Sequence, residues 1–254
     1  MIFVAAGTQD GRELAAALTR RGHEVIASVV SRYGEQLLAA CGSERLTVND
    51  EPLDEAGLVR YIKLHGIRAF VDASHPYAVN VSKNAMAACH QTGVPYIRYE
   101  RALSALGYAD IHLVHSYEEA AEKAASFGQN VFLTTGSRNL ARFTQAKALH
   151  ACQITARVLP TAEVLALCES LSLTPGQIVA LQGPFSTRLN RELFEKYEAD
   201  VIVTKNSGAI GGTDTKIEAA RELSLPVVMI DRPVLAYDTL AQTYEEVIRF
   251  VEEV

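Results

Sequence analysis

The sequence predicts an α/β fold in which parallel sheets are covered by helices on both faces. Short apolar or β-branched runs alternate with amphipathic stretches from the first residue to the last, which is typical of repeated strand–helix units. The strands outnumber those of one compact small sheet, and the alternation falters over residues 102–110 before it restarts. We therefore expect two Rossmann-like, doubly wound parallel-sheet domains with a cleft between them, divided near Leu106 into residues 1–106 and 107–254.

The expected strands are short runs rich in Val, Ile and Leu, bounded by polar or glycine-containing turns. They cover residues 2–6, 24–30, 45–48, 69–73, 96–99, 112–114, 131–135, 154–159, 178–181, 201–204 and 227–230. Amphipathic stretches predict helices at residues 12–21, 33–41, 54–65, 78–92, 117–127, 162–171, 187–197, 216–223 and 244–253. Three expected N-caps, Asp10, Ser116 and Thr215, each precede a glutamate by three positions, as in a capping box.

The composition excludes several classes of protein. The chain has 24 Lys and Arg against 30 Asp and Glu, a net charge of −6, which argues against a nucleic-acid-coating protein. No apolar run approaches the roughly 18 residues of a membrane helix, and the N-terminus lacks the basic residues of a signal peptide. The 4 cysteines form no CxxC pair and fit reduced, buried thiols, so we expect a cytoplasmic protein.

We expect no metal site. His112 and His115 lie three positions apart in a stretch that reads as a strand. Side chains with this spacing point to opposite faces of a sheet, so the two histidines cannot share a metal ion.

The loop after the first strand contains the first candidate ligand-binding residues. In a doubly wound sheet, ligands bind beyond the carboxyl ends of the strands. This turn reads Ala5-Ala-Gly-Thr-Gln-Asp-Gly-Arg12, and its Gly7 and Thr8 would present backbone amides and a hydroxyl to a pyrophosphate at the helix N-terminus. The segment lacks a complete GxGxxG, so a plain tight turn is an alternative.

Ser31 and Arg32 follow the second strand, where a domain selective for NAD carries an acidic residue. An arginine at this place favours the 2′-phosphate of NADP. A solvated arginine at the start of a helix is the alternative. Together with the first turn, this position predicts that residues 1–106 form a nucleotide-binding domain.

The loop after the strand at 69–73 places polar residues at the same edge. Pro76 would set the start of the next helix, with Tyr77 in its first turn and Ser74 and His75 just before it. A histidine here could donate a proton or a hydrogen bond to a ligand. Alternatively, Ser74 and His75 only cap the helix.

Three loops in the second half combine glycine and hydroxyl residues with cations, which is typical of anion binding. Their candidate residues are Thr135, Gly136 and Arg138; Gly183, Ser186 and Arg188; and Lys205, Ser207, Gly208 and Lys216. The helix dipole disfavours a cation in the first turn expected for Lys216, so a negative charge should compensate it. Glu218 could supply that charge, as could a ligand carboxylate or phosphate.

In this order and spacing, the loops resemble those of precorrin-6A reductases, including the cobalt-precorrin-6A reductase branch of cobalamin biosynthesis. The resemblance runs nearly end to end and rests on the GT-containing first turn, Ser31-Arg32, residues 72–78 and 134–138, Gln182-Gly-Pro-Phe-Ser186, Val203-Thr-Lys-Asn-Ser-Gly208, Lys216-Ile-Glu-Ala-Ala-Arg-Glu-Leu223 and Pro226-Val-Val-Met-Ile-Asp-Arg-Pro233. The chain departs at Ala6, where relatives commonly have a glycine, and this leaves the detailed pyrophosphate contact open.

The resemblance implies an enzyme that uses NADPH, with NADH as the alternative, to reduce the double bond between ring carbons 18 and 19 of precorrin-6A or its cobalt form. Combined with the loops, it makes the following residues candidates for cofactor binding: Gly7, Thr8, Ser31, Arg32, Ser74, Thr135 and Gly136. The candidates for substrate binding are Arg138, Gly183, Ser186, Arg188, Ser207, Gly208 and Lys216. His75, Tyr77 and Lys205 are the candidate catalytic residues, with an ordered water as another proton source.

The implied partner is a small-molecule tetrapyrrole, with no nucleic acid and no membrane. Its many acetate and propionate arms make it a polyanion, so an acidic protein would concentrate cations where it binds. Monomer and small homo-oligomer both stay open, as does transient contact with neighbouring enzymes of the pathway.

Two alternative functions make different demands on the sequence. A reductase of the short-chain type needs Tyr-x-x-x-Lys on a helix, and four residues after Tyr33, Tyr77, Tyr117 and Tyr197 the chain has Leu37, Val81, Ala121 and Val201. A module that senses NADP without turnover stays open, but it predicts one ligand site where the loops predict two.

Overall fold

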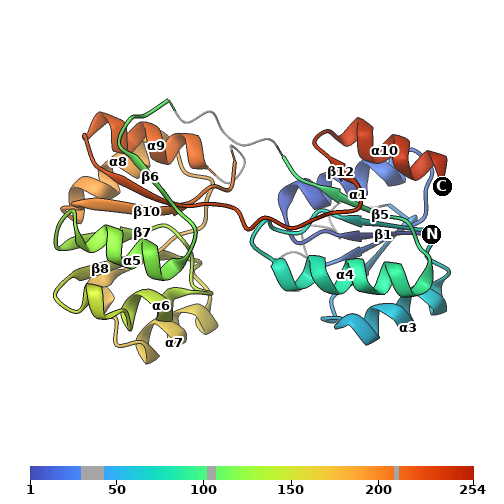
Figure 1. The fold of residues 1–254 in the computed structure, drawn as a ribbon, viewed down its shortest axis with the longest axis horizontal. Coiled ribbons are helices and arrows are strands. Elements are labelled where there is room, and N and C mark those ends of the chain that lie inside the picture. The colour runs from blue at the N-terminus through green and yellow to red at the C-terminus, as the bar shows by residue number, and fades with distance from the viewer. Residues whose placement is uncertain (30–42, 102–106, 209–211) are drawn as a thin grey trace. The chain divides into compact units, whose positions relative to one another are not determined.

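The computed structural model describes residues 1–29, 43–101, 107–208 and 212–254. The chain divides into two compact units, which are Met1–Ala102 with Pro233–Val254 (unit 1) and Leu103–Arg232 (unit 2). Within the described residues, each unit contains one 6-stranded parallel sheet with helices on both faces (Figure 1). This confirms the predicted fold class of two doubly wound parallel-sheet domains.

Unit 1 has the strand order β12-β5-β4-β1-β2-β3. Its strands are β1 (Ile2–Ala5), β2 (Val25–Ser28), β3 (Leu46–Asn49), β4 (Ala69–Asp72), β5 (Tyr96–Tyr99) and β12 (Leu240–Ala241). Its described helices are α1 (Gln9–Arg20), α3 (Glu55–His65), α4 (Val79–Thr92) and α10 (Tyr244–Glu253). This is the strand order 3-2-1-4-5-6 of a Rossmann sheet, with β12 in the sixth position.

The core of unit 1 follows from the alternation of side chains along its strands. On β1, Ile2 and Val4 pack with the buried residues of α1 and α10, whereas Phe3 and Ala5 pack with those of α3 and α4. Both faces of the sheet are therefore apolar, and the polar edge at the carboxyl ends of the strands is left for ligands.

The C-terminal segment corrects the predicted domain division. The sequence predicts residues 107–254 as one domain, but residues 233–254 belong to unit 1. There β12 pairs with β5, with Leu240 opposite Arg98 and Ala241 opposite Tyr99, and α10 buries Val251 in the core. A 2-residue strand is too short to form an apolar run, so the return of the chain left no signal in the sequence.

Unit 2 has the strand order β6-β11-β10-β7-β8-β9. Its strands are β6 (Ile111–Val114), β7 (Asn130–Leu133), β8 (Gln153–Val158), β9 (Ile178–Ala180), β10 (Val201–Lys205) and β11 (Val227–Ile230). Its described α-helices are α5 (Tyr117–Ala125), α6 (Leu140–Thr144), α7 (Ala162–Ser170), α8 (Thr187–Lys196) and α9 (Thr213–Glu222), with 3-10 turns at Lys147–Leu149 and Pro175–Gln177. With β7 counted first, this order repeats that of unit 1, so β6 takes the place that β12 takes there.

One of the three predicted N-cap residues caps its helix in the structure. Ser116 caps α5 and accepts a hydrogen bond from the Glu119 N–H at 3.0 Å, as predicted. The other two predictions were wrong: Thr8 rather than Asp10 caps α1, and α9 begins after Gly212, which places Thr215 inside the helix. At α1 the Thr8 hydroxyl accepts from the Gly11 N–H at 3.0 Å, whereas α9 begins after a glycine in the left-handed region and has no side-chain cap.

The helix expected at residues 33–41 lies outside the described residues. Helix α6 and the two 3-10 turns were not predicted, because they are too short to show a helical period. No helix among the described residues is long and apolar enough to cross a membrane.

Candidate functional site

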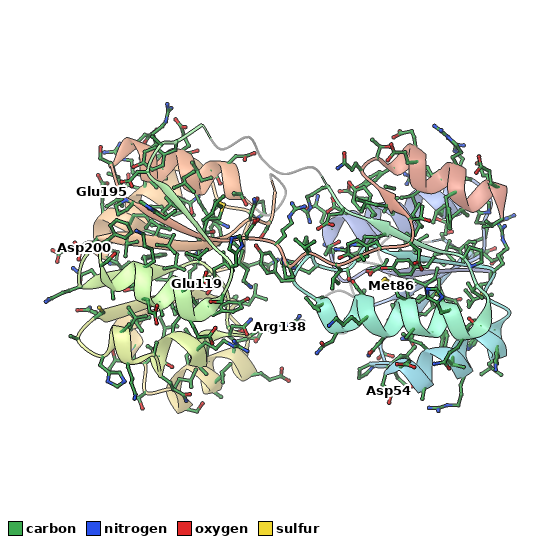
Figure 2. The ribbon with its side chains drawn as sticks, viewed as in Figure 1. Asp54, Met86, Glu119, Arg138, Glu195 and Asp200 are labelled. Atoms are coloured by element: carbon green, nitrogen blue, oxygen red, sulfur yellow. The ribbon has the colours of Figure 1, made fainter. Side chains whose placement is uncertain are left out.

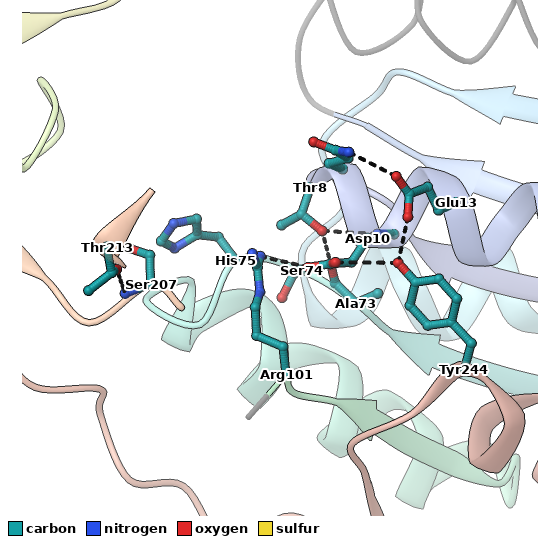
Figure 3. A network of polar contacts seen from close by, with 12 residues as sticks. Thr8, Asp10, Glu13, Ala73, Ser74, His75, Arg101, Ser207, Thr213 and Tyr244 are labelled. Carbon is teal, nitrogen blue, oxygen red and sulfur yellow. Dashed lines mark hydrogen bonds and ion pairs between the residues drawn. The ribbon is translucent and has the colours of Figure 1, made fainter. Parts of the chain in front are cut away.

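In unit 1, β1 pairs with β2 on one side and with β4 on the other. The chain leaves β1 toward β2 and leaves β4 toward β5, so the loops after β1 and β4 diverge and form the switch point at which doubly wound sheets bind ligands. Thr8 links these loops, because its Oγ1 donates to the carbonyl of Ala73 at 2.8 Å (Figure 3). The structure thus brings Thr8 close to the loop of Ser74 and His75, as predicted.

The two glycines of the first turn have different roles. A Cβ on Gly11 would lie 2.7 Å from the Cα of Ala6, so only glycine allows α1 to pack this closely on β1. A Cβ on Gly7 would meet nothing within 4 Å. Gly7 is exposed beside the N-terminus of α1, where its backbone is accessible to a ligand.

An acidic group lies in the first turn of α1 and is neutralised within unit 1. Asp10 is 2% exposed and forms an ion pair of 2.7 Å with Arg101. The Tyr244 hydroxyl, contributed by α10, lies 3.3 Å from Asp10 and 2.8 Å from Glu13 (Figure 3). Burial raises the pKa of Asp10, and Arg101 opposes this rise only in part. Arg101 and Tyr244 were not among the residues predicted from the sequence.

Ser74 belongs to a buried network around Asp72. The Asp72 carboxylate accepts hydrogen bonds from Arg98 Nη1 at 2.9 Å, Ser82 Oγ at 2.6 Å, Tyr96 OH at 2.8 Å and the Ser74 N–H at 3.0 Å. Arg98 also donates to Ser74 Oγ at 3.1 Å. Burial raises the pKa of Asp72, but Arg98 and the hydrogen bonds outweigh burial and hold the pKa below its ordinary value. This network ties the loop after β4 to β5 and α4.

His75 and Tyr77 lie in a turn that precedes α4. The Ala78 N–H donates to the His75 carbonyl at 2.8 Å, and the helix begins only at Val79, so the expectation that Tyr77 lies in the first helical turn was wrong. No side chain caps this helix. The Tyr77 N–H donates to His75 Nδ1 at 3.3 Å, so a neutral imidazole would carry its proton on Nε2.

Ser31 and Arg32, the predicted contacts to the adenosine ribose and its phosphate, lie outside the described residues. Their role remains a prediction from the sequence.

In unit 2, the switch point lies between β7 and β10. Thr135 and Gly136 follow β7, and Ser207 and Gly208 follow β10. Thr213, the first residue of α9, closes the second loop: its Oγ1 accepts from the Ser207 N–H at 3.2 Å, and its N–H donates to the Gly208 carbonyl at 3.3 Å. Gly208 has φ +76°, a conformation that favours glycine.

A buried hydroxyl at this edge lacks a hydrogen-bond partner. Thr135 is 5% exposed, and its Oγ1 is unpartnered in the described part of the chain. Buried polar groups in native proteins are nearly always satisfied by protein, water or ligand. Gly136 beside it has φ +77°, which turns the backbone sharply at the end of β7. These features support the prediction that this loop contacts a ligand.

Four cations of unit 2 influence one another. Lys216 on α9 is 7% exposed, and burial, followed by the charges of Arg157 and Lys205, lowers its pKa to about 7. Burial and Arg138 lower the pKa of Lys205 to about 8. Arg138, labelled in Figure 2, is exposed. Like charges of this kind destabilise a free protein and favour binding of a polyanion.

The predicted ligand-binding residues of the loop after β9 make contacts within the protein. Ser186 caps α8 and accepts from the Leu189 N–H at 3.2 Å. The Arg188 side chain is 89% exposed and lies 3.8 Å from Glu192. A Cβ on Gly183 would lie 3.0 Å from the Phe185 ring, so this glycine leaves room for the ring.

Three arginines of these networks, Arg98, Arg101 and Arg157, were not predicted from the sequence. A signal existed for Arg98 and Arg157, because each follows an apolar residue inside a run that predicts a buried strand. An arginine at such a position needs a specific partner or a ligand. Which group it meets depends on residues that are distant in the sequence, so no local pattern reveals it.

The chain is similar along nearly its whole length to known proteins of one family. The family model described as "Precorrin-6x reductase CbiJ/CobK" matches residues 1–252. A cobalt-precorrin-6A reductase of Priestia megaterium is 42% identical over 98% of this chain and 96% of the relative, and one of Salmonella typhimurium is 37% identical over 91% and 87%. The solved structure described as "CobK precorrin-6A reductase" is 28% identical, with a TM-score of 0.79 over 99% of this chain and 96% of that chain.

Proposed function

Because the chain belongs to the precorrin-6x reductase family, we propose that it reduces precorrin-6A or cobalt-precorrin-6A with NADPH as the hydride donor. It is an oxidoreductase that acts on a carbon–carbon double bond of a tetrapyrrole in cobalamin biosynthesis. The match over residues 1–252 carries this assignment. The relatives reported above are all named reductases, so the alternative of a sensor without turnover gains no support.

We assign the nucleotide to the switch point of unit 1. The features that fit it are the unobstructed backbone of Gly7, the N-terminus of α1 and the neutralisation of Asp10 by Arg101. Thr8, Ser74, Ser31 and Arg32 complete this part of the site, and Thr135 and Gly136 of unit 2 are further candidates. A bound reduced nicotinamide supplies the hydride, and the residues of the chain bind and orient it.

We assign the carboxylate arms of the tetrapyrrole to unit 2. The cations Lys216, Lys205 and Arg138 support this assignment, because their charges add up at one edge of a protein with a net charge of −6. Ser207 and Gly208 contribute backbone groups from the loop closed by Thr213. Gly183, Ser186 and Arg188 remain candidates for binding the same arms, in addition to their structural roles in the loop after β9 and at the start of α8.

The reaction adds one hydride and one proton across the double bond and converts NADPH to NADP⁺. A proton donor must therefore stand near the carbon next to the hydride acceptor. The imidazolium form of His75, the Tyr77 hydroxyl and Lys205, with its lowered pKa of about 8, are the candidate donors.

The direct test is anaerobic incubation of the protein with NADPH and precorrin-6A, and in parallel with its cobalt form. We expect loss of NADPH absorbance, a change in the spectrum of the macrocycle and a mass gain of two hydrogens. Binding of both ligands without any mass change would reject the proposal and favour the sensor.

Arg32→Ala tests the choice of NADPH over NADH. If the guanidinium contacts the 2′-phosphate, the variant should lose affinity for NADPH about tenfold or more, while its weak use of NADH stays the same. Exposed Arg20→Ala, in the last turn of α1, serves as the control, because it removes the same charge elsewhere in unit 1. An unchanged ratio of kcat/KM for the two nucleotides would show that Arg32 does not select NADPH.

A further inference from the structure

Arg157 of β8 is a buried cation whose charge is not neutralised by the protein. It is 6% exposed, and among the described residues no carboxylate lies within ion-pair distance of it. Burial lowers its pKa to about 10, so the guanidinium is still charged at neutral pH. Arg98, the other buried strand arginine, is paired with Asp72 at 2.9 Å. A buried charge without a counter-charge destabilises a free protein. Unlike Arg98, Arg157 is therefore available to pair with an anionic ligand.

Neutral groups hold the guanidinium in place on two sides. Its Nη1 donates to Asn190 Oδ1 at 2.6 Å, and its Cζ lies 4.1 Å from the centroid of the Phe185 ring. Gly183 leaves the space that this ring occupies, as noted above. Both contacts orient the planar group and leave its charge intact.

Asn190 is itself fixed. It is fully buried on α8, and its Nδ2 donates to the Ser186 carbonyl at 3.0 Å and to Thr215 Oγ1 at 3.3 Å. With the amide nitrogen engaged there, Oδ1 is the atom that faces Arg157. An asparagine in this place orients the arginine as an aspartate would, but without neutralising it.

Lys216 adds a second positive charge beside the guanidinium. Arg157 is the larger of the two charged influences on the Lys216 ammonium, and Thr215, its neighbour in α9, contacts Asn190. A buried guanidinium oriented by neutral groups, with a second buried cation beside it, is suited to an oxyanion with more than one acceptor oxygen.

We propose that Arg157 binds a carboxylate arm of the tetrapyrrole substrate and that Asn190 is its positioning residue. This inference rests on the proposed function and deepens it, because it names a substrate-binding residue that neither the loops nor the resemblance indicates. A nucleotide phosphate has similar chemistry. The carboxylate is favoured because Lys216, Lys205 and Arg138 extend the positive charge through unit 2, which suits a ligand with many acidic arms.

Asn190→Asp is the sharpest test. The variant would place a carboxylate about where Oδ1 lies, pair with Arg157 and compete with the substrate. We expect the Kd for precorrin-6A, titrated by absorbance without NADPH, to rise about tenfold or more. Loss of the Nδ2 bond to the Ser186 carbonyl opposes the new ion pair, so a cooperative melting transition serves only to show that the variant is folded. The Kd for NADPH should stay unchanged. Arg191→Gln, an exposed residue next to it on α8, changes the net charge by the same amount and should leave both Kd values unchanged.

Arg157→Lys is the second variant, because it keeps the charge but loses the planar fork. It should also weaken macrocycle binding and spare NADPH, whether or not Asn190→Asp folds. A merely structural role for Arg157 predicts lower Tm values with unchanged macrocycle Kd, and that result would overturn the inference. Weaker NADPH binding with unchanged macrocycle binding would assign the oxyanion to the nucleotide and also overturn it. Failure of the wild-type protein to bind the macrocycle at all would reject the proposed function itself.

Discussion

Arg98 and Asp72 form an ion pair of 2.9 Å in which both side chains are fully buried. The pair joins the end of β4 to β5 and reaches Ser74 in the loop that faces the proposed nucleotide site. Because Arg98 contacts both Asp72 and Ser74, loss of the ion pair would also change the position of this loop.

Arg98→Met should destabilise unit 1 by roughly 3–5 kcal/mol, because it leaves Asp72 as an unpaired buried charge. Urea unfolding followed by circular dichroism measures the effect. The exposed pair between Arg21 and Glu252, at 3.2 Å, provides the control: Arg21→Met should cost no more than about 1 kcal/mol. Equal losses for the two variants would show that burial does not strengthen the Asp72 pair.

The same pair should affect acid stability. A carboxylate with a lowered pKa stabilises the folded state fully above its unfolded pKa, near 4, and this contribution is lost as pH falls through the folded pKa. Wild-type unit 1 should therefore lose stability below about pH 4 more steeply than Arg98→Met does. Parallel pH profiles of Tm would contradict this assignment.

Gly7→Ala and Gly11→Ala form a matched pair in the first turn. Gly11→Ala should cost about 1–3 kcal/mol of folding stability, because its Cβ would overlap the Ala6 backbone. Gly7→Ala meets no protein atom within 4 Å and should leave stability within about 0.5 kcal/mol. It should instead raise the Kd for NADPH by about tenfold, since the methyl group occupies space next to the proposed pyrophosphate site. An unchanged Kd would remove the nucleotide from this turn.

Lys216 should make stability and ligand binding depend on pH. Its pKa falls from 10.5 in a free chain to about 7 when folded, so between these values the unfolded chain binds more protons. The stability of the free protein should rise from pH 7 toward pH 10, and Lys216→Met should flatten that rise. Because a bound anion favours the charged ammonium, the affinity for precorrin-6A should fall as pH rises above 7 in the wild type. A variant with the same pH profile as the wild type would assign the titration to another group, with Lys205 the first candidate.

The C-terminal helix should stabilise the N-terminal unit. Val251 of α10 is fully buried in the core of unit 1, so Val251→Asp should lower the Tm of that unit strongly and abolish NADPH binding. Exposed Glu253→Gln on the same helix is the control. If the variant unfolds unit 2 instead, the assignment of residues 233–254 to unit 1 is wrong.

The arrangement of elements was largely predictable because it depends on local patterns. The apolar residues of Ile2–Ala5 are enough to predict β1. The loops that form each candidate site were chosen by the rule that ligands bind at the carboxyl ends of parallel strands. The candidate residues Thr8, Ser74, Ser207 and Lys216 could be chosen in this way. Arg157 could be suspected from its place in an apolar strand, but its partner Asn190 lies 33 positions away on another element.

By itself, the sequence determined the alternation of strands and helices, the presence of two doubly wound units and the membership in a reductase family, because periodicity and motif order are properties of contiguous residues. Only the tertiary structure decided that β12 completes the first sheet, that Asp72 neutralises Arg98 and that an uncharged amide holds Arg157. Each of these is a pairing between distant residues. Packing selects such pairings by burial and charge, and no local pattern in the chain encodes them.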